Sequence, residues 1–482
     1  MAVLGNIEPK KVFQFFEELC QIPHGTFDTK RISDHCVKFA KDRGLEVTQD
    51  EANNVIIRKG GTAGYEDSEP VILQGHLDMV CVKTPDSTHD FDNDPLDLYV
   101  EDGFVKAKDT SLGGDDGIAV AMAMAVLDSD DIPHPPIEAV FTTDEETGMG
   151  GANAIDLSVL KGRKLLNIDS EIEGILTAGC AGGISMIAEI PVKREERNGA
   201  LVTLDVCGLQ GGHSGIEIDK QRGNAHKLMG RLLNEITKEA EIYLVDITGG
   251  SKDNVISMSS VANVVISEAD TEKVVKIANE MKSVWDNEFM GDEPTLEVKV
   301  DVKESASANA CDRESTDKLI NYLVICPNGV QAFSRKLTGL VESSLNLGIV
   351  ETTDEYIKAG HMIRSSVESQ KQFMYKQMNC LAKMVGAKTY ITSEYPAWQY
   401  NPNSELCGLM ENIYKEMFHE APQVFAVHAG LECGLFLGKR ADLDCVSVGP
   451  NLLDVHSFNE KVDIASVERT WNYLKAILAA LK

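Results

Sequence analysis

Basic residues are scarce in this 482-residue chain. Lysine and arginine number 46 against 76 aspartates and glutamates, which leaves a formal net charge of -30. Nucleic acids and anionic membrane surfaces would be repelled by such a charge, and no basic stripe with interleaved aromatics offsets it. The composition therefore argues against nucleic acid and membrane as partners. A chain of this length is expected to form two or three domains.

Long hydrophobic runs and a secretory leader are also lacking. The longest apolar stretch, Ile118 to Leu127, is about half the length that spans a bilayer. The first residues contain neither a basic segment nor a long apolar one. The 11 cysteines are irregularly spaced without a Cys-x-x-Cys pair, which suits buried reduced thiols better than a disulfide framework. We therefore expect a cytoplasmic protein.

Several familiar catalytic motifs are missing as well. The chain has no His-Glu-x-x-His of mononuclear zinc proteases and no Gly-x-Ser-x-Gly nucleophile elbow. The glycines Gly113 and Gly114 could form a phosphate loop before a helix. Two aspartates follow them directly and would oppose a phosphate, and no Gly-Lys-Ser/Thr follows. These absences disfavour serine hydrolases, simple zinc proteases and nucleotide-binding enzymes.

The first third of the chain alternates helical and strand-like patterns. Helical spacing covers Lys10 to Cys20, Thr29 to Arg43 and the small-residue stretch Asp115 to Leu127, and buried strands are expected at Val71 to Met79, Ile137 to Thr143 and Lys164 to Asp169. Short apolar strands alternating with helices predict an α/β fold with a mostly parallel central sheet. In such sheets ligands bind beyond the carboxyl ends of the strands.

The pattern changes near residue 180 to half-exposed strands and charged helices. Ser185 to Pro191 and Ala200 to Gly208 alternate like strands, and Asn224 to Ala240 reads as a helix. This α+β texture continues to about residue 393. We predict a discontinuous first domain, 1–186 and 396–482, with an inserted α+β domain at 187–395. Two strand-then-helix patterns in the insert suggest two similar halves.

Histidines and acidic clusters stand where apolar runs end. They are His76 and Asp78 after the run 71–75, Asp115 and Asp116, Glu145 and Glu146, Asp169, and His456 near the C-terminus. Two imidazoles and several carboxylates suit a pair of divalent cations. The chain is therefore predicted to be a metal-dependent hydrolase.

Local geometry suggests roles for some of these side chains. Residues two apart in a strand face the same side, so His76 can bind a metal while Asp78 holds its ring. Glu145 and Glu146 cannot point the same way in an extended backbone. One of them can bind metal while the other faces the metal-bound water as a general base. Asp115, after flexible glycines, is suited to bridge two metals.

Charge balance supports a two-metal site. Two divalent ions would bring four positive charges. Asp115, Glu146, Asp169 and a bridging hydroxide would bring four negative ones, with two neutral imidazoles completing the shells. A partly buried site requires such neutrality.

These residues, in this order, resemble the co-catalytic di-zinc exopeptidases of the M-twenty metallopeptidase family. The resemblance runs nearly end to end through 22–24, 73–80, 111–118, 180–183, 211–215, 327–330, 428–436 and 449–456. It implies a zinc-exopeptidase-like catalytic domain with a mostly parallel sheet and an inserted α+β lid domain. Carried over, it makes His76, Asp115 and Asp169 the shell of one zinc, and Asp115, Glu146 and His456 the shell of the other.

The resemblance also implies catalytic and substrate-binding roles. Asp78 is similar to the family's orienting aspartate and Glu145 to its general base, and the Asp115–Asp116 peptide bond is expected to be cis. In the lid, Arg364 is similar to the arginine that clamps the substrate carboxylate. Asn254, His213 and Gly430 are expected to contact substrate.

The implied activity is hydrolysis of unblocked dipeptides, including Xaa-His substrates such as carnosine. A hydroxide bridging two divalent metals would attack, and Glu145 would act as general base. Zinc is the expected metal, with manganese or cobalt as alternatives. Asp116 departs from family members that carry Asn there, which leaves metal preference open. A homodimer is compatible with the resemblance, and whether the lid completes the site in cis or in trans stays open.

Two other functions fit much of the pattern. An aminoacylase or deacetylase on the same scaffold would share every metal residue, and only the readers of the substrate's amine and carboxylate would differ. A metal-stabilised peptide-binding protein without catalysis would also keep the ligands. Glu145 argues against that reading, because a structural site needs no spare base.

Overall fold

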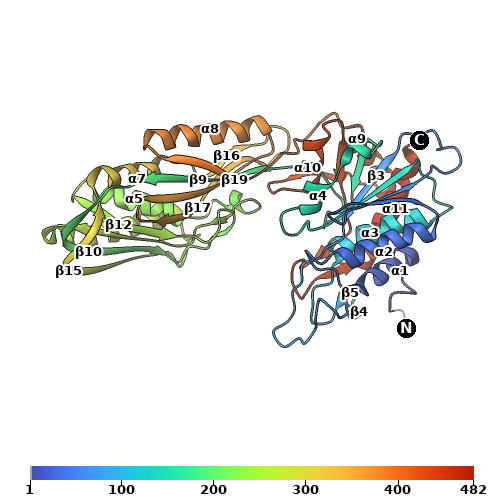
Figure 1. Ribbon diagram of the computed structural model, residues 1–482, viewed down its shortest axis with the longest axis horizontal. Coiled ribbons are helices and arrows are strands. Elements are labelled where there is room, and N and C mark those ends of the chain that lie inside the picture. The colour runs from blue at the N-terminus through green and yellow to red at the C-terminus, as the bar shows by residue number, and fades with distance from the viewer. Residues whose placement is uncertain (1–2) are drawn as a thin grey trace. The chain divides into compact units, whose positions relative to one another are not determined.

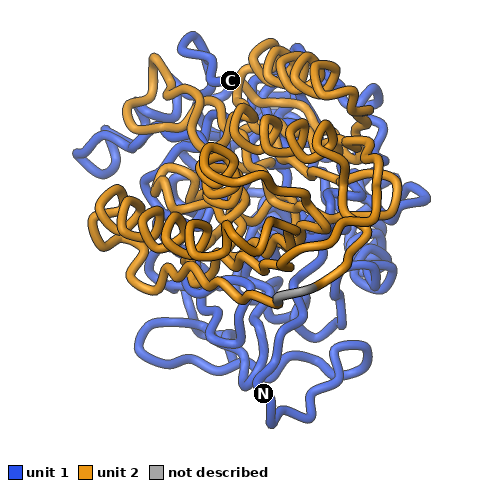
Figure 2. Tube along the Cα trace, turned by 90° about the vertical axis from the view of Figure 1, so that its left-hand side faces the viewer, with its two compact units in different colours: residues 1–179, 400–426, 431–482 blue, residues 180–399, 427–430 orange. Residues whose placement is uncertain are grey.

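The computed structural model describes residues 3–482, which form two compact units. The first unit contains the chain up to residue 179 together with 400–426 and 431–482, and the second contains 180–399 and 427–430 (Figure 2). Each unit has its own hydrophobic core. The second unit is thus inserted into the first along the chain. Assigning catalysis to one and a lid role to the other remains a prediction, as does the internal repeat.

The first unit is built on an eight-stranded sheet (Figure 1). In spatial order its strands are β1 (Glu46–Gln49), β2 (Val55–Lys59), β6 (Ile137–Thr142), β3 (Val71–His76), β7 (Lys164–Asn167), β21 (Asp444–Ser447), β8 (Ile175–Cys180) and β20 (Gln423–Val427). The central strands β6, β3, β7 and β21 are parallel, while β1 and β2 are antiparallel. The expected α/β fold with a mostly parallel central sheet is confirmed.

Helices cover this sheet because its central strands are apolar on both faces. All residues of β3 and β6 are buried. The helices are α1 (Lys10–Cys20), α2 (Lys30–Asp42), α3 (Gly114–Asp128), α4 (Gly150–Ala154), α9 (Glu405–Phe418), α10 (Glu432–Lys439) and α11 (Ile464–Ala480), with a short turn η1 (Leu157–Val159). Helices α1, α2 and α3 lie together in Figure 1. The buried stripe of α1, with Val12, Phe16 and Leu19 at helical spacing, packs against α3, whose residues 118–127 are all buried.

A small four-stranded sheet completes the first unit. It runs β22 (Leu452–Leu453), β23 (Lys461–Asp463), β5 (Phe104–Ala107) and β4 (Leu98–Glu101), all antiparallel. The loop between β22 and β23 carries His456. This loop reaches the sheet edge where the acidic residues gather.

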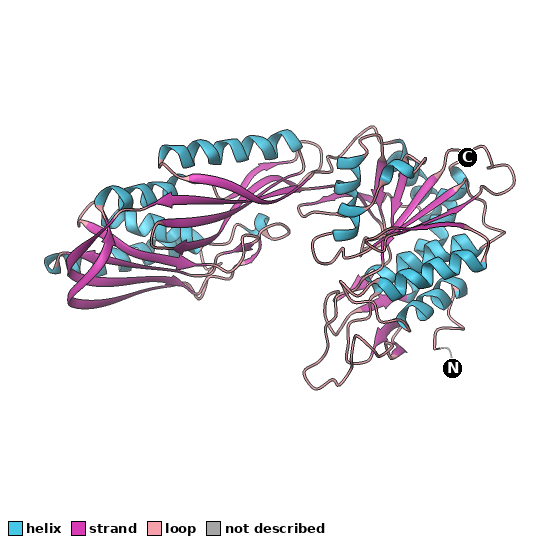
Figure 3. Ribbon diagram, viewed as in Figure 1, coloured by secondary structure: helices cyan, strands magenta, loops and turns pink. Residues whose placement is uncertain are grey.

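The second unit is a nine-stranded antiparallel sheet with four helices (Figure 3). Its strands are β15 (Glu297–Cys311), β10 (Arg194–Cys207), β14 (Ser260–Ile266), β12 (Ile242–Gly249), β17 (Val341–Thr352), β18 (Tyr356–Ser365), β9 (Gly182–Pro191) and β19 (Lys388–Tyr395), with β16 (Gly329–Phe333) beside β17. The helices are α5 (Ala225–Ile236), α6 (Thr271–Phe289), α7 (Arg313–Ile325) and α8 (Glu368–Met384). A separate ribbon pairs β11 (Gly212–His213) with β13 (Val255–Ile256), and short turns η2 (Ile218–Lys220) and η3 (Glu268–Asp270) complete the unit.

Alternating burial explains why these strands need the helices. In β10, Val202, Leu204 and Val206 are buried while the residues between them are half-exposed. The buried set belongs to the same core as the apolar faces of the helices. One face of the sheet is therefore packed by helices, as the strand-and-helix pattern predicts.

Element boundaries agree closely with the sequence-based expectations in the first third. Helix α1 and strand β6 lie where they are expected, whereas β3 ends at His76 and β7 at Asn167. The residues beyond those two ends form loops that carry site side chains. Among residues 3–482, no helix combines the length and the apolar character that a bilayer crossing requires. Cys20, Cys36 and Cys445 are buried thiols, as expected for several of the cysteines.

Candidate metal centre

Three neighbouring parallel strands place the candidate site. Strand β3 ends at His76, β6 is followed by the loop with Glu145 and Glu146, and β7 is followed by Asp169. The carboxyl ends of parallel neighbours meet at one edge of a sheet. Asp115 reaches the same edge from the start of α3, and His456 reaches it from the β22–β23 loop.

Asp115 lies between the two imidazoles. Its Oδ1 is 3.1 Å from Nε2 of His76, and its Oδ2 is 3.3 Å from Nε2 of His456. Asp169 Oδ1 lies 3.7 Å from the same His76 nitrogen, and Glu146 Oε2 lies 2.9 Å from the His456 nitrogen. The side chains expected to hold metal therefore lie together as two overlapping sets that share Asp115. Their roles as ligands stay predictions.

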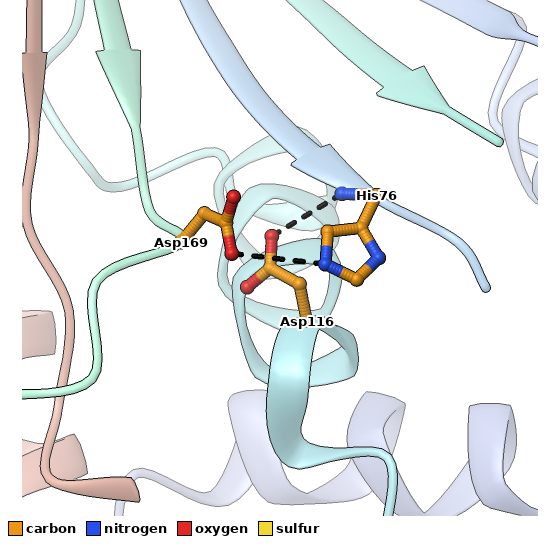
Figure 4. Close-up of side chains that lie close together, drawn as sticks. All are labelled: His76, Asp116 and Asp169. Carbon is orange, nitrogen blue, oxygen red and sulfur yellow. Dashed lines mark hydrogen bonds and ion pairs between the residues drawn. The ribbon is translucent and has the colours of Figure 1, made fainter. Parts of the chain in front are cut away.

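Asp116 is a second neighbour of His76 that sequence reasoning did not treat as a ligand. Its carboxylate accepts a hydrogen bond from the backbone N–H of His76 at 3.2 Å, and it lies beside Asp169 (Figure 4). Two groups in the described chain could hold an ion, one formed by His76, Asp116 and Asp169 and one by His76, Asp115 and Glu146. Asp116 can approach β3 closely because Gly75 has no side chain. A Cβ at Gly75 would lie 2.6 Å from Oδ2 of Asp116. The Asp115–Asp116 peptide is cis, as expected.

Asp78 connects the first imidazole to the loop after β6. Its Oδ1 lies 3.5 Å from Nδ1 of His76, whose other nitrogen faces the acidic cluster. The same carboxylate accepts hydrogen bonds from the backbone N–H groups of Glu145 at 3.0 Å and Glu146 at 3.3 Å. Asp78 can therefore fix both the orientation of the imidazole and the position of the two glutamates.

The cluster contains more buried carboxyl groups than its two imidazoles can neutralise when they are protonated. Burial, with the nearby Asp115 and Glu146, raises the pKa of Asp169 to about 6. Burial also raises the pKa of Glu145 well above its ordinary value. Burial lowers the pKa of His76, but the hydrogen bonds that its imidazole donates to Asp115 and Asp169 outweigh this effect and leave that pKa well above the usual range.

The second imidazole responds in the same direction. Hydrogen bonds that the imidazole donates to Asp115 and Glu146 raise the pKa of His456 to about 11. Protons on the two imidazoles thus partly neutralise the carboxylates. Glu146 Oε1 and Asp116 Oδ1 are nevertheless buried without a hydrogen-bond partner. Unpaired carboxylate oxygens, nitrogen donors and surplus negative charge fit divalent cations, which would take the place of those protons.

Two further acids at this edge were not assigned by sequence reasoning. Glu432, at the start of α10, is 1% exposed, and it accepts hydrogen bonds from Gln74 at 2.6 Å and Thr142 at 2.8 Å. Burial raises its pKa to about 7. Glu460 accepts hydrogen bonds from the segment that leads into Asp115. Glu432 lies within a stretch that carries the family resemblance, which could have drawn attention to it, whereas Glu460 gives no such signal.

Among the residues of the second unit that are expected to bind substrate, Arg364 contributes a buried positive charge. Arg364 in β18 is 4% exposed, and its Nη1 donates to the Tyr395 hydroxyl at 2.7 Å. Its Nε is buried without a partner. No carboxylate in the described chain lies within ion-pair distance of this guanidinium. A buried arginine without a counter-ion favours an anionic ligand.

Two histidines lie near this arginine. His428 Nε2 lies 2.7 Å from the Ser344 hydroxyl, and its Nδ1 is buried without a partner. His213 in β11 accepts hydrogen bonds through Nδ1 from the N–H groups of Gly215 and Ile216, both at 3.2 Å, so its Nε2 carries the proton. Both rings are therefore available as neutral donors.

The remaining lid candidates have different surroundings. Gly430 lies against the ring of Tyr395, and a Cβ there would come 2.8 Å from a ring carbon. Asn254 precedes β13, and its backbone carbonyl accepts from Ser214 at 2.9 Å. Gly430 therefore packs against Tyr395, and its contact with substrate stays a prediction. The geometry within the second unit also brings Tyr395 and His428 into a group that the sequence did not assign.

Similarity to characterised proteins agrees with this geometry. The chain is 37% identical over 480 residues to the cytosol non-specific dipeptidase of Escherichia coli K12, covering 99% of each chain. Its structure matches that of an aminoacylhistidine dipeptidase from Vibrio alginolyticus with a TM-score of 0.91 and 34% identity, covering 99% of this chain and 98% of the other. An aminopeptidase from Bacillus cereus shares the fold at a TM-score of 0.57 and 15% identity, covering 98% and 99%.

A family model also matches most of the sequence. The model describes peptidase family M20/M25/M40, and it aligns with residues 72–480. This range contains every residue of the candidate metal centre and every lid residue discussed above. The chain therefore belongs to peptidase family M20/M25/M40.

Proposed function

We propose that this chain is a cytoplasmic metal-dependent dipeptidase that hydrolyses unblocked dipeptides, including Xaa-His substrates such as carnosine. The observation that carries the proposal is the position of Asp115, with one oxygen toward His76 and the other toward His456. A carboxylate shared in this way suits two cations held side by side. Full-length similarity to two dipeptidases supports the substrate class.

Two divalent cations fit the cluster. His76, Asp115 and Asp169 would hold one, and Asp115, Glu146 and His456 would hold the other. Mixed nitrogen and oxygen donors suit zinc, and manganese or cobalt would also be accepted. When bound, the cations would polarise the scissile carbonyl and lower the pKa of the attacking water.

Glu145 is proposed as the general base. It is a buried carboxyl whose pKa is raised by burial and by the acids around it. Cations would lower this pKa by offsetting the charge of Asp115 and Asp169, which would leave Glu145 ionised and ready to accept a proton. It would take a proton from the attacking water and pass it to the leaving amine. The backbone carbonyl of Asp78 lies 3.0 Å from Nδ1 of His76, and its carboxylate accepts from the backbone N–H of Glu145. Asp78 would therefore hold the base and the metal ligand in their relative positions.

The second unit is proposed to supply side chains that bind the substrate, including its free C-terminal carboxylate. Arg364 would bind the free C-terminal carboxylate, since it is buried and lacks an acidic partner. His213 and Asn254 are proposed to contact the same substrate. Carboxylates of the metal centre would attract the free α-ammonium group. Groups that bind both a free carboxylate and a free ammonium group favour a dipeptide with both ends unblocked.

A substrate panel tests the proposal. Purified protein loaded with zinc is assayed on dipeptides, among them carnosine, and on the N-acetyl forms of the same amino acids. Unblocked dipeptides should be cleaved with the higher kcat/KM. Faster cleavage of the acetylated set would replace the dipeptidase assignment with an aminoacylase.

Metal analysis tests the ligands separately. His76→Ala and His456→Ala should each lose bound metal relative to the unmodified chain. Full occupancy in either variant would remove that histidine from the shell.

A further inference from the structure

Glu460 is a buried carboxylate outside the predicted ligand set that grips four consecutive backbone N–H groups. Oε2 accepts from Leu112 at 2.8 Å and Gly113 at 3.1 Å, and Oε1 accepts from Gly114 at 2.8 Å and Asp115 at 3.3 Å. Its residue exposure is 4%. Backbone N–H groups that donate to a buried carboxylate favour its ionised form.

The gripped segment determines where Asp115 points. Gly113 has φ +68° and Asp115 itself is non-helical, so regular helix geometry does not place this side chain. A Cβ on Gly114 would lie 2.6 Å from Val462 and 3.3 Å from Oε1 of Glu460. The segment is therefore docked closely on strand β23, with the Glu460 carboxylate as its anchor.

The anchor lies in the loop that carries the second imidazole. His456 and Glu460 both belong to the short connection between β22 and β23, and His456 has φ +59° with its side chain 50% exposed. Within the loop, Ser457 holds Asp454 and Glu460 through short-range hydrogen bonds. Glu460 thus ties the loop of one predicted ligand, His456, to the segment of another, Asp115.

We propose that Glu460 is a positioning residue that fixes the separation between Asp115 and His456 and thereby sets the affinity of the cation that both would hold. The inference rests on the proposed function, because it assigns Glu460 to that metal centre. Residues that orient metal ligands typically contribute 10- to 100-fold to metal affinity. The competing view is a cap on α3 that stabilises the fold alone, since an anion at a helix N-terminus is favourable in itself.

A matched pair of variants separates these two roles. Glu460→Gln leaves one acceptor oxygen and turns an amide NH₂ toward backbone donors. Glu138 is a suitable control, because it is 3% exposed and also accepts from backbone N–H groups, those of Lys161 and Gly162, both at 2.9 Å. It lies near the amino end of β6, away from the loop with Glu145.

Zn²⁺ affinity is measured for each full-length variant by competition with a chelator, and the Tm of the metal-free protein is measured in parallel. Glu460→Gln should weaken the binding of one of two Zn²⁺ ions by about 10- to 100-fold, and excess Zn²⁺ should restore activity. Glu138→Gln should lower Tm and keep the Zn²⁺ affinity of the unmodified chain. Glu460→Asp, which can still accept from part of the segment, should show an intermediate loss.

Unchanged Zn²⁺ affinity in Glu460→Gln would overturn the inference, whatever the Tm. If that variant does not fold, the affinity of Glu460→Asp decides in the same way. Failure of the proposed function looks different. An unmodified chain that binds two Zn²⁺ ions but cleaves no dipeptide would refute the dipeptidase and leave the affinity comparison intact.

Discussion

The two units contain charged clusters of opposite sign, and their histidines differ accordingly. In the first unit, hydrogen bonds to carboxylates raise the pKa of His456 to about 11. In the second unit, burial and the nearby Arg364 lower the pKa of His428 to about 3. Burial and the same arginine also lower the pKa of His213. One cluster therefore holds protons in place of cations, and the other keeps its imidazoles neutral.

This contrast shows what each cluster is built to bind. Acids gathered around His76 and His456 remain partly uncompensated, so the first cluster favours cations. Arg364 is buried without a carboxylate, so the second favours an anion. A metal-dependent enzyme that reads a free carboxylate needs both. The following experiments remove one side of the contrast at a time.

The largest effect is expected from the first unit. Glu145→Gln should lower kcat by at least about 10²-fold, because the proposed proton acceptor is lost. Metal content should stay normal, since Glu145 is not among the predicted ligands. Steady-state kinetics and metal analysis of the same preparation check both statements. Activity of the variant equal to that of the unmodified chain would refute the assigned base. If the unmodified chain itself binds metal but shows no turnover, the non-catalytic alternative would hold instead.

Removal of the arginine tests the second unit. Arg364→Ala should reduce kcat/KM for free dipeptides by about 10²-fold, because a charge-assisted contact with the substrate carboxylate is lost. Dipeptide amides, which lack that carboxylate, should be affected much less. Arg231→Ala is the control, since Arg231 forms an exposed pair with Glu288 in the same unit. Equal losses for acids and amides would show that Arg364 does not read the carboxylate.

Sequence patterns predict the parts of the site that end regular strands. His76 and Asp169 follow buried runs, and these runs become neighbouring parallel strands. His456 is harder, because it lies in a loop between strands of two and three residues that have no periodicity of their own. Its assignment depends on the family resemblance rather than on local pattern.

Residues that act through distant backbone are not visible in the sequence. Glu460 bonds a segment some 345 positions away, and Glu432 bonds Gln74 across 358 positions. No spacing rule connects such pairs. The strand order of the second unit, in which β9 lies between β18 and β19, likewise arises from long-range pairing. Strand formation is therefore easier to predict from the sequence than the pairing between strands.

The protons held by the first cluster should make metal binding depend on pH. The metal-free chain keeps protons on His76 and His456 near neutrality, since both pKa values are raised. A cation must displace them, so its apparent affinity should rise with pH between 6 and 8, by roughly tenfold per pH unit for each proton released. Chelator competition across this range measures the slope. A flat profile would contradict protonated imidazoles in the metal-free site.

The smallest effect on substrate binding is expected from removal of the Tyr395 hydroxyl, which accepts a hydrogen bond from Arg364. Tyr395→Phe keeps the ring that packs against Gly430 and removes only the hydroxyl that accepts from the guanidinium at 2.7 Å. A hydrogen bond of this kind contributes about 1 kcal/mol, so KM for dipeptides should rise about fivefold with kcat nearly unchanged.

Tyr390 provides the control for this variant. It lies in the same strand, is 40% exposed, and donates its hydroxyl to Glu189 at 3.2 Å. Tyr390→Phe should leave KM unchanged. In an Arg364→Ala background, Tyr395→Phe should have no further effect, because the hydroxyl acts only through the guanidinium. Additive losses in that double variant would mean that Tyr395 contacts substrate directly. The second cluster would then bind its anion through the tyrosine hydroxyl as well as through the arginine.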